Sequence, residues 1–141
     1  MEKIELKNSR GKVFFKSWYD VTSNQIVAEW IGFVTLQNVK EACTEGLKLL
    51  KDTSCPFLLN SNEELEGSWD EANEWIAETW MPQALNYGLK RFAHIVSDDI
   101  FVEISAEEMV SRTSKYNFEM RMFKQRHEAR EWLRAEADVV L

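Results

Sequence analysis

The chain has few of the residues that build metal and redox sites. Its 141 residues include two cysteines, Cys43 and Cys55, and two histidines, His94 and His127. The cysteines are too few and too far apart for a metal-knuckle or redox motif, and two histidines cannot form a histidine-rich metal site on their own. We therefore expect no metal ion and no cofactor, and we expect both cysteines to be free thiols.

Long apolar runs are also missing. No segment approaches the roughly 20 apolar residues that are needed to cross a membrane. The first residues, MEKIELKNSRGK, contain no apolar run of the kind that signal peptides have. The expected setting is therefore the reducing cytoplasm, without stable insertion into a membrane.

Positive charge is scarce relative to negative charge. The chain has 17 Lys and Arg against 24 Asp and Glu, which gives a formal net charge of -7. A net negative charge repels a phosphate backbone, so nucleic acid is excluded as an expected partner. The basic residues of the last quarter are interleaved with glutamates, a pattern typical of a solvated helix face.

The signatures of the common enzyme classes are absent as well. The sequence has no nucleophile elbow, P-loop, Rossmann glycine signature or zinc-ligand spacing. His94 lies in the middle of a predicted strand, and we interpret it as a core or rim histidine rather than a proton-transfer group. Glu29 is interpreted as an outward-facing strand residue. We predict that the protein is not an enzyme and has no catalytic residues.

What the chain does have is ordinary apolar content and many tryptophans. With 45% hydrophobic and 29% charged residues, the composition is that of a globular protein, and the length predicts a single domain over 1–141. Tryptophans usually fill a core with one polar edge, and the alternative is a ligand-lining or interface role. The six tryptophans are Trp18, Trp30, Trp69, Trp75, Trp80 and Trp132.

Segments typical of strands and helices alternate along the chain. The predicted strands are 12–19, 25–33, 57–60, 91–97 and 117–123. The predicted helices are 35–52, 69–88, 105–113 and 124–137. The order β-β-α-β-α-β-α-β-α predicts an α/β fold with a mostly parallel sheet of four or five strands, an antiparallel N-terminal hairpin, and helices packed on the sheet.

Helix starts are indicated by hydroxyl side chains. Thr35 is a suitable N-cap for the first helix. Ser68 and Ser105 are each followed three residues later by a glutamate, the spacing of a capping box. We therefore expect helices to begin next to these three residues.

Two residues inside predicted helices need a special explanation. Gly46 lies in the apolar stripe of its helix, and we expect it to let that helix pack closely on the sheet. Pro82 cannot continue the backbone hydrogen-bond ladder, so the tryptophan-rich helix should kink or restart near Met81.

The residues 60–67, NSNEELEG, predict a polar loop before the tryptophan-rich helix. Ligands of open α/β sheets bind outside the carboxyl ends of the strands, which selects Asn60 and Ser61 here and Asp98 after a later strand. Trp75 lies off the apolar stripe of its helix, and exposed tryptophans mark interfaces. The predicted ligand or partner surface comprises Asn60, Ser61, Ser68, Trp69, Trp75, Trp80 and Asp98. The alternative roles are helix cap for Ser68 and turn residue for Asp98.

Three stretches carry a family resemblance: WIGFVTLQNVKEA, FLLNSNEELEGSWDEANEWI and GLKRFAHIVSDD. Together with a closing pattern of Phe123, Ala129, Trp132 and Leu133, they resemble the SpoIIAA-like branch of the STAS superfamily, named for sulfate transporters and anti-sigma-factor antagonists. The likeness covers roughly 12–133 and consists of spaced aromatics, glycines and strand ends. It implies a domain of about this size and a relation in fold to the CRAL-TRIO lipid-exchange domains.

The resemblance also implies a regulatory role through protein binding. In anti-sigma-factor antagonists, phosphorylation of a serine between a strand and a helix switches that binding. The corresponding place here is the predicted loop between Asn60 and Trp69, with Ser61 and Ser68 as candidate phosphorylation sites. The Asp-Ser-Ser-Gly type motif of those switch proteins is absent from this chain.

Two functions follow as hypotheses. The first is a non-enzymatic interaction or regulatory module, expected to bind a protein partner or itself as a homodimer. The alternative is a carrier or sensor of a small apolar ligand or lipid, bound between the helix from Trp69 to Tyr87 and the sheet.

Overall fold

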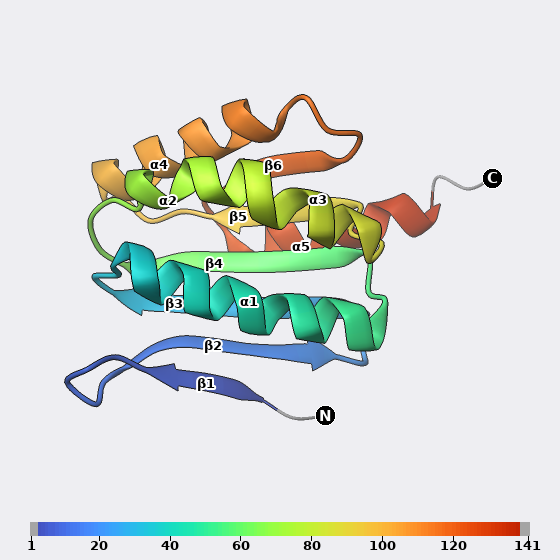
Figure 1. Cartoon of the computed structure of the whole chain (residues 1–141). Coiled ribbons are helices and arrows are strands. Elements are labelled where there is room, and N and C mark those ends of the chain that lie inside the picture. The colour runs from blue at the N-terminus through green and yellow to red at the C-terminus, as the bar shows by residue number, and fades with distance from the viewer. Residues whose placement is uncertain (1–2, 139–141) are drawn as a thin grey trace.

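Six strands form one mixed sheet, and their order in space is their order along the chain (Figure 1). This computed structural model describes residues 3–138. The strands are β1 (Ile4–Lys7), β2 (Val13–Asp20), β3 (Gln25–Gly32), β4 (Phe57–Leu65), β5 (Arg91–Ile95) and β6 (Glu119–Phe123). The first three strands pair antiparallel and β3 to β6 pair parallel. The predicted α/β architecture is confirmed, with six strands in place of four or five, because the short strand β1 has too few alternating residues to be recognised.

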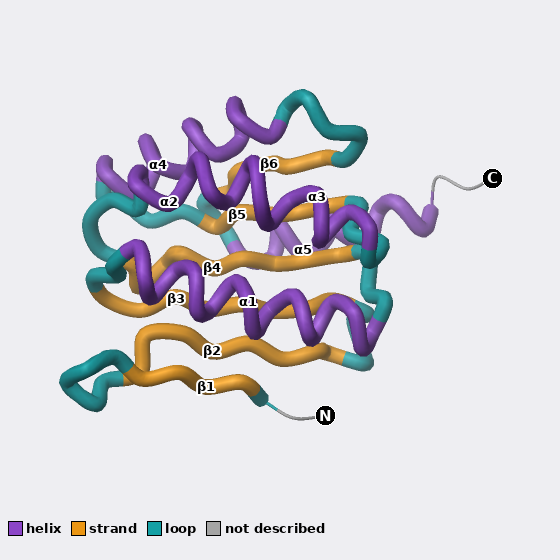
Figure 2. Tube along the Cα trace, viewed as in Figure 1, coloured by secondary structure: helices purple, strands orange, loops and turns teal. Residues whose placement is uncertain are grey.

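The helices cover the two faces of the sheet unequally (Figures 1 and 2). They are α1 (Leu36–Thr53), α2 (Asp70–Trp75), the π-helical segment η1 (Ile76–Trp80), α3 (Met81–Asn86), α4 (Ile100–Thr113) and α5 (Arg126–Asp138). The connections from β3 to β6 all step in the same direction across the sheet, so right-handed crossovers place their helices on one face. Helix α5 packs on the opposite face against β4, β5 and β6.

Each face of the sheet has its own core. Ile26 and Ala28 of β3 point towards α1 in the larger core, whereas Val27 points towards α5. The smaller core consists of Val27, Leu59, Ala93, Ile95, Ala129 and Leu133. Successive residues of β3 thus point to opposite faces of the sheet, as expected for a strand.

Polar residues inside β4 overturn the predicted loop. The strand runs over Phe57–Leu65, so most of the NSNEELEG segment is strand. In the ladder, Asn60 is opposite Ala28 of β3 and His94 of β5. The expectation of a loop is wrong because the buried amides of this strand find hydrogen-bond partners on neighbouring strands, which offsets the cost of burying them.

The N-terminus of α1 has the expected cap, but that of α2 does not. Thr35 Oγ1 accepts a hydrogen bond from the Asn38 N–H, and Asn38 Oδ1 accepts one from the Thr35 N–H. The capping box expected at Ser68 is wrong, because Trp69 occupies the N-cap position of α2. Ser68 Oγ instead accepts a hydrogen bond of 3.0 Å from the N–H of Asp70.

Helix α4 begins earlier than predicted. Its N-cap is Asp99, whose Oδ1 accepts a hydrogen bond of 2.9 Å from the Phe101 N–H. The cap expected at Ser105 is therefore wrong. Ser105 lies inside the helix, where its hydroxyl accepts from the Trp69 N–H and donates to Asp70 Oδ1. This serine ties α4 to the start of α2.

The tryptophan-rich helix continues through Pro82 with a π-helical segment before it. The Met81 N–H donates to the carbonyl of Ile76, five residues back, which defines the π turn. The irregularity expected near Met81 is thus confirmed, and the backbone resumes as α3 through Pro82.

Gly46 does not have the role expected from its place in the apolar stripe. A Cβ atom built on Gly46 would have no atom of residues 3–138 within 4 Å, apart from its chain neighbours and the backbone of its own helix. The expectation of close helix packing at this glycine is wrong, since the space beside it belongs to a cavity.

Candidate functional site

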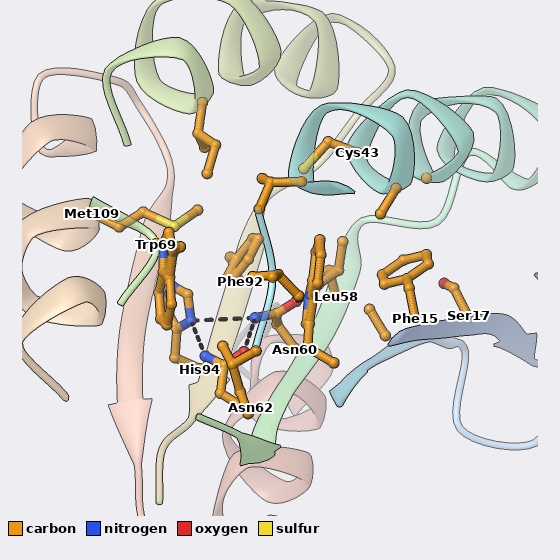
Figure 3. Close-up of a pocket in the computed structure, with 18 of the residues that line it drawn as sticks. Phe15, Ser17, Cys43, Leu58, Asn60, Asn62, Trp69, Phe92, His94 and Met109 are labelled. Carbon is orange, nitrogen blue, oxygen red and sulfur yellow. Dashed lines mark hydrogen bonds between the residues drawn. The ribbon is translucent and has the colours of Figure 1, made fainter. Parts of the chain in front are cut away.

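A cavity of about 60 Å³ lies between the sheet and the helices on the face that carries the larger core (Figure 3). Strands β2 to β5 form one wall, and α1, the first part of the tryptophan-rich helix, and Met109 of α4 form the other. Most of its lining is apolar, including Phe15, Leu58 and Phe92. The cavity therefore lies where the sequence predicts an apolar ligand, between this helix and the sheet.

One end of this cavity carries a buried polar cluster on three neighbouring strands. The Trp30 indole Nε1–H donates to Asn60 Oδ1 at 2.9 Å, and Asn60 Nδ2 donates to Asn62 Oδ1 at 3.1 Å. His94 Nδ1 lies 3.4 Å from Asn60 Nδ2 and 3.3 Å from Asn62 Nδ2 (Figure 3). We call these four residues the amide–imidazole cluster. The sequence pattern predicts Asn60 as a site residue but not its hydrogen-bond partners.

The imidazole of the cluster is neutral. His94 is 1% exposed, and burial lowers its pKa from 6.5 to about 3. Its Nε2 atom has no hydrogen-bond partner among residues 3–138. The burial of His94 confirms its interpretation as a core histidine, but its Nε2 nitrogen makes no hydrogen bond within residues 3–138.

The predicted tryptophan surface lies largely in the core. Trp69 is buried, and its ring stacks on that of His94 with 6.3 Å between centroids. Trp80 is buried and donates its Nε1–H to the carbonyl of Cys43 at 2.9 Å. Trp75 is half-buried beside Lys40, whose Nζ lies 5.8 Å from the ring centroid. Because Trp80 is buried and Trp75 is half-buried, neither side chain supports an interface at these residues.

The two candidate phosphorylation sites differ in access. Ser61 is buried in β4, and its Oγ donates to Glu63 Oε1 at 2.8 Å. A phosphate there would be buried beside a carboxylate, which is unfavourable. Ser68 is exposed, and its Oγ lies 3.1 Å from Ser105 Oγ. Phosphorylation of either serine stays a prediction, and access favours Ser68.

The loops after β3, β4 and β5 meet at one end of the sheet, which we call the carboxyl edge (Figure 1). Asp99 Oδ2 accepts a hydrogen bond of 3.1 Å from the Gly67 N–H, joining two of these loops. That bond, together with the N–H groups at the start of α4, lowers the pKa of Asp99. Asp98 is exposed at this edge, whereas Asn60 and Ser61 lie in mid-strand, so the structure does not bring these predicted residues together.

Large apolar side chains are exposed at the same edge. Phe33 follows β3, and its ring lies against Gly67, where an added Cβ would be 3.0 Å from a ring carbon. Ile100 and Phe101 open α4, and Ile104 follows one turn later. The exposed fractions are 72% for Phe33, 64% for Ile100, 59% for Phe101 and 48% for Ile104. We call these four residues the carboxyl-edge patch. The sequence does not predict this patch, because the capping-box spacing at Ser105 places the predicted start of α4 too late.

The titratable residues considered for catalysis lie apart. His94 faces the larger core, while Glu29 lies on the α5 side and pairs with Arg126 at 3.0 Å. Asp98 is exposed beyond the end of β5. Within 3–138 there is no group of three His, Cys, Asp or Glu that could hold a metal ion. No helix in that described range is long and apolar enough to span a membrane.

Comparisons with known proteins bear on the fold. No protein-family model matches the chain, and no curated protein matches it. Among solved structures, it is similar to the crystal structure of an uncharacterized protein of the DUF3478 family with a SpoIIAA-like fold from Shewanella loihica PV-4. The identity is 18%, the TM-score is 0.50, and the match covers 93% of each chain. The SpoIIAA-like fold expected from the resemblance is thereby confirmed, and the relation to CRAL-TRIO domains stays a prediction.

Proposed function

We propose that this protein is a non-enzymatic interaction module that docks a protein partner on the carboxyl-edge patch. The observation that carries the proposal is the exposure of four large apolar side chains, from 48% for Ile104 to 72% for Phe33, at one edge of the sheet. Clustered exposed apolar residues are typical of interaction surfaces. The absence of a catalytic constellation among the described titratable residues supports the non-enzymatic part.

Charge around the patch indicates the chemistry of the partner. Glu66, Asp70 and Asp98 are exposed at the carboxyl edge, and the whole chain has a formal net charge of -7. A partner with an apolar centre and a basic rim would complement this surface. A twofold contact between two copies would bring the same acidic residues together, so the charges favour a different protein over the expected homodimer.

Site-specific photo-crosslinking in cells tests this assignment. A benzoylphenylalanine placed at Phe101 should form a crosslink to a protein partner. The control is the same probe at Val21, which is 71% exposed in the turn at the opposite end of β3. The Phe101 crosslink should be lost when Glu66 and Asp98 are both changed to Lys, because the rim charge is reversed. Equal crosslinking at Val21, or a crosslink that survives the charge reversal, would contradict the proposal.

Sedimentation of the purified protein separates a foreign partner from a second copy. The proposal expects a monomer at micromolar concentration for the wild type and for the variant Phe101→Asp. A wild-type dimer that Phe101→Asp dissociates would show that the patch binds a second copy, and would overturn the assignment to a basic partner.

The alternative function, a carrier of a lipid, has weaker support. The cavity lies at the place where that hypothesis puts its ligand, but ligand pockets usually measure about 300–1,000 Å³. At about 60 Å³, this cavity has no room for a lipid chain unless the helices move away from the sheet.

A further inference from the structure

The indole of Trp30 fixes the direction of every hydrogen bond in the amide–imidazole cluster. An indole N–H can only donate, so the Asn60 atom that it contacts at 2.9 Å must be the amide oxygen. The Asn60 NH₂ group then faces Asn62 and His94. Its contact with Asn62 at 3.1 Å must likewise end on the amide oxygen of Asn62. The NH₂ group of Asn62 is therefore also directed at His94.

Two amide donors thus converge on one imidazole nitrogen. Asn60 Nδ2 and Asn62 Nδ2 lie 3.4 and 3.3 Å from His94 Nδ1, so that nitrogen must accept and cannot carry a proton. The buried ring is neutral and holds one proton. That proton must lie on Nε2, which makes Nε2–H a hydrogen-bond donor.

This donor belongs to a residue in the wall of the cavity. His94 lines the cavity and is 1% exposed, and its Nε2 atom has no partner among residues 3–138. A buried donor without an acceptor is destabilising, so a molecule that supplies one would bind favourably. We propose that the cavity binds a small, uncharged, mainly apolar molecule whose carbonyl or ether oxygen accepts the Nε2–H of His94. This site is separate from the carboxyl-edge patch, and neither proposal depends on the other.

The cavity excludes charged and long ligands. None of the residues within 3–138 that line it is Lys or Arg, so a carboxylate would be buried without a counter-ion. His94 cannot act as that counter-ion near neutral pH, because burial keeps its pKa near 3. The volume of about 60 Å³ admits only a few heavy atoms without displacement of a helix. A short ketone meets these conditions, and a fatty acid does not.

NMR titration of the wild-type protein with histidine labelled by ¹⁵N tests the proposal. The first readout, without ligand, is the tautomer of His94, expected with the proton on Nε2. The probes are butanone, its alkene isostere with C=CH₂ in place of C=O, and propanoate. Butanone should shift the Nε2–H signal and bind about tenfold more tightly than the alkene, because one buried hydrogen bond contributes on that order. Propanoate should not bind.

A pair of leucine substitutions in α1 provides a matched control. Gly46 lines the cavity, so Gly46→Leu should fill it and abolish butanone binding. Lys48→Leu adds the same side chain where the lysine is 66% exposed, and should leave binding unchanged. If Gly46→Leu does not fold, the comparison of the three probes on the wild type still tests whether the Nε2–H of His94 recognises an acceptor.

Three outcomes would overturn the proposal. A proton on Nδ1 of His94 would contradict the hydrogen-bond directions argued from Trp30. Equal affinity for butanone and its alkene isostere would show that Nε2–H recognises no acceptor. No shift with any probe would show that the donor is satisfied by buried water only.

Discussion

Replacing Gly46 by alanine should stabilise the protein. Glycine in the interior of a helix costs about 1 kcal/mol relative to alanine. A Cβ at this position would enter open space beside the cavity rather than strike the sheet, since nothing among residues 3–138 outside its own helix lies within 4 Å of it. Part of that methyl group would be removed from water, and a buried methylene contributes about 0.8 kcal/mol. Together these contributions predict a stabilisation of about 1–2 kcal/mol.

Urea unfolding followed by tryptophan fluorescence measures this change. At this chain length the melting temperature should also rise by roughly 4 °C for each kcal/mol. The control is the pair Glu41→Ala and Glu41→Gly, at an exposed position of the same helix. The difference between these two variants gives helix propensity alone, and any excess at Gly46 is the contribution of the cavity.

A neutral or destabilising result at Gly46 would refute the reasoning. If the Glu41 pair shows the usual difference while Gly46→Ala lowers the free energy of unfolding, α1 must lie closer to the sheet than the structure places it. The cavity assignment would then fail along with the prediction.

Three further predictions concern buried polar and titratable groups. Because burial lowers the pKa of His94 from 6.5 to about 3, the unfolded state binds more protons between these values, and stability is lost as the pH falls through this window. Urea unfolding should show a loss of about 3 kcal/mol between about pH 7 and about pH 4 from this group. His94→Gln should remove that dependence, while His127→Gln, at an exposed position, should keep it. Burial raises the pKa of Cys43 to about 12, and only a thiolate reacts readily. Dithiobisnitrobenzoate should therefore leave this thiol unlabelled in the folded protein and label it in urea; rapid labelling of the native protein would contradict the raised pKa. Ser61→Asp should lower the free energy of unfolding by about 2 kcal/mol or more, because it buries a negative charge in β4 beside the carboxylate of Glu63. Ser68→Asp, at an exposed position, should change the free energy of unfolding by less than about 1 kcal/mol. Similar losses of stability for both substitutions would refute the claim that Ser61 is buried and Ser68 is accessible.

The parts of the fold that the sequence predicts are those with local signals. The apolar stripe of α1 and its cap at Thr35 lie within a few residues of each other, and the alternation of β3 is visible over eight residues. Both are confirmed because a helix or strand with one buried face must repeat its apolar residues at the period of that element. The SpoIIAA-like architecture follows from the order of such elements.

The misplaced elements depend on contacts between residues far apart in the sequence. Ser105 has the spacing of a helix cap, but its hydroxyl bonds to the backbone of Trp69 and the carboxylate of Asp70. The cap of α4 is Asp99 instead, directly before two exposed apolar residues. A local motif cannot decide between such alternatives, because tertiary packing selects which hydroxyl is buried. The carboxyl-edge patch was missed for the same reason.

The extension of β4 at the candidate binding site likewise depends on contacts that local sequence patterns do not reveal. Asn60 and Asn62 favour loops by their local preferences. In the folded chain their amides are held by Trp30 and His94, which lie 30 and 32 to 34 residues away in sequence. No pattern within β4 reveals those partners, so the sequence alone selects Asn60 for the wrong reason and omits the others.

The amide–imidazole cluster also explains how a strand with so many polar residues keeps its register. A shift of β4 by one residue would move Asn60 to the α5 face, where the neighbouring side chains are those of Val27 and Ala93. Its amide would then be buried without a partner, and Ser61, which has no amide donor, would lie opposite His94 instead. Both changes are unfavourable, so the cluster penalises the shifted pairing more strongly than an apolar strand would. The same hydrogen bonds that fix the register also fix the proton of His94 on Nε2, so the proposed binding site is a consequence of how this sheet specifies its alignment.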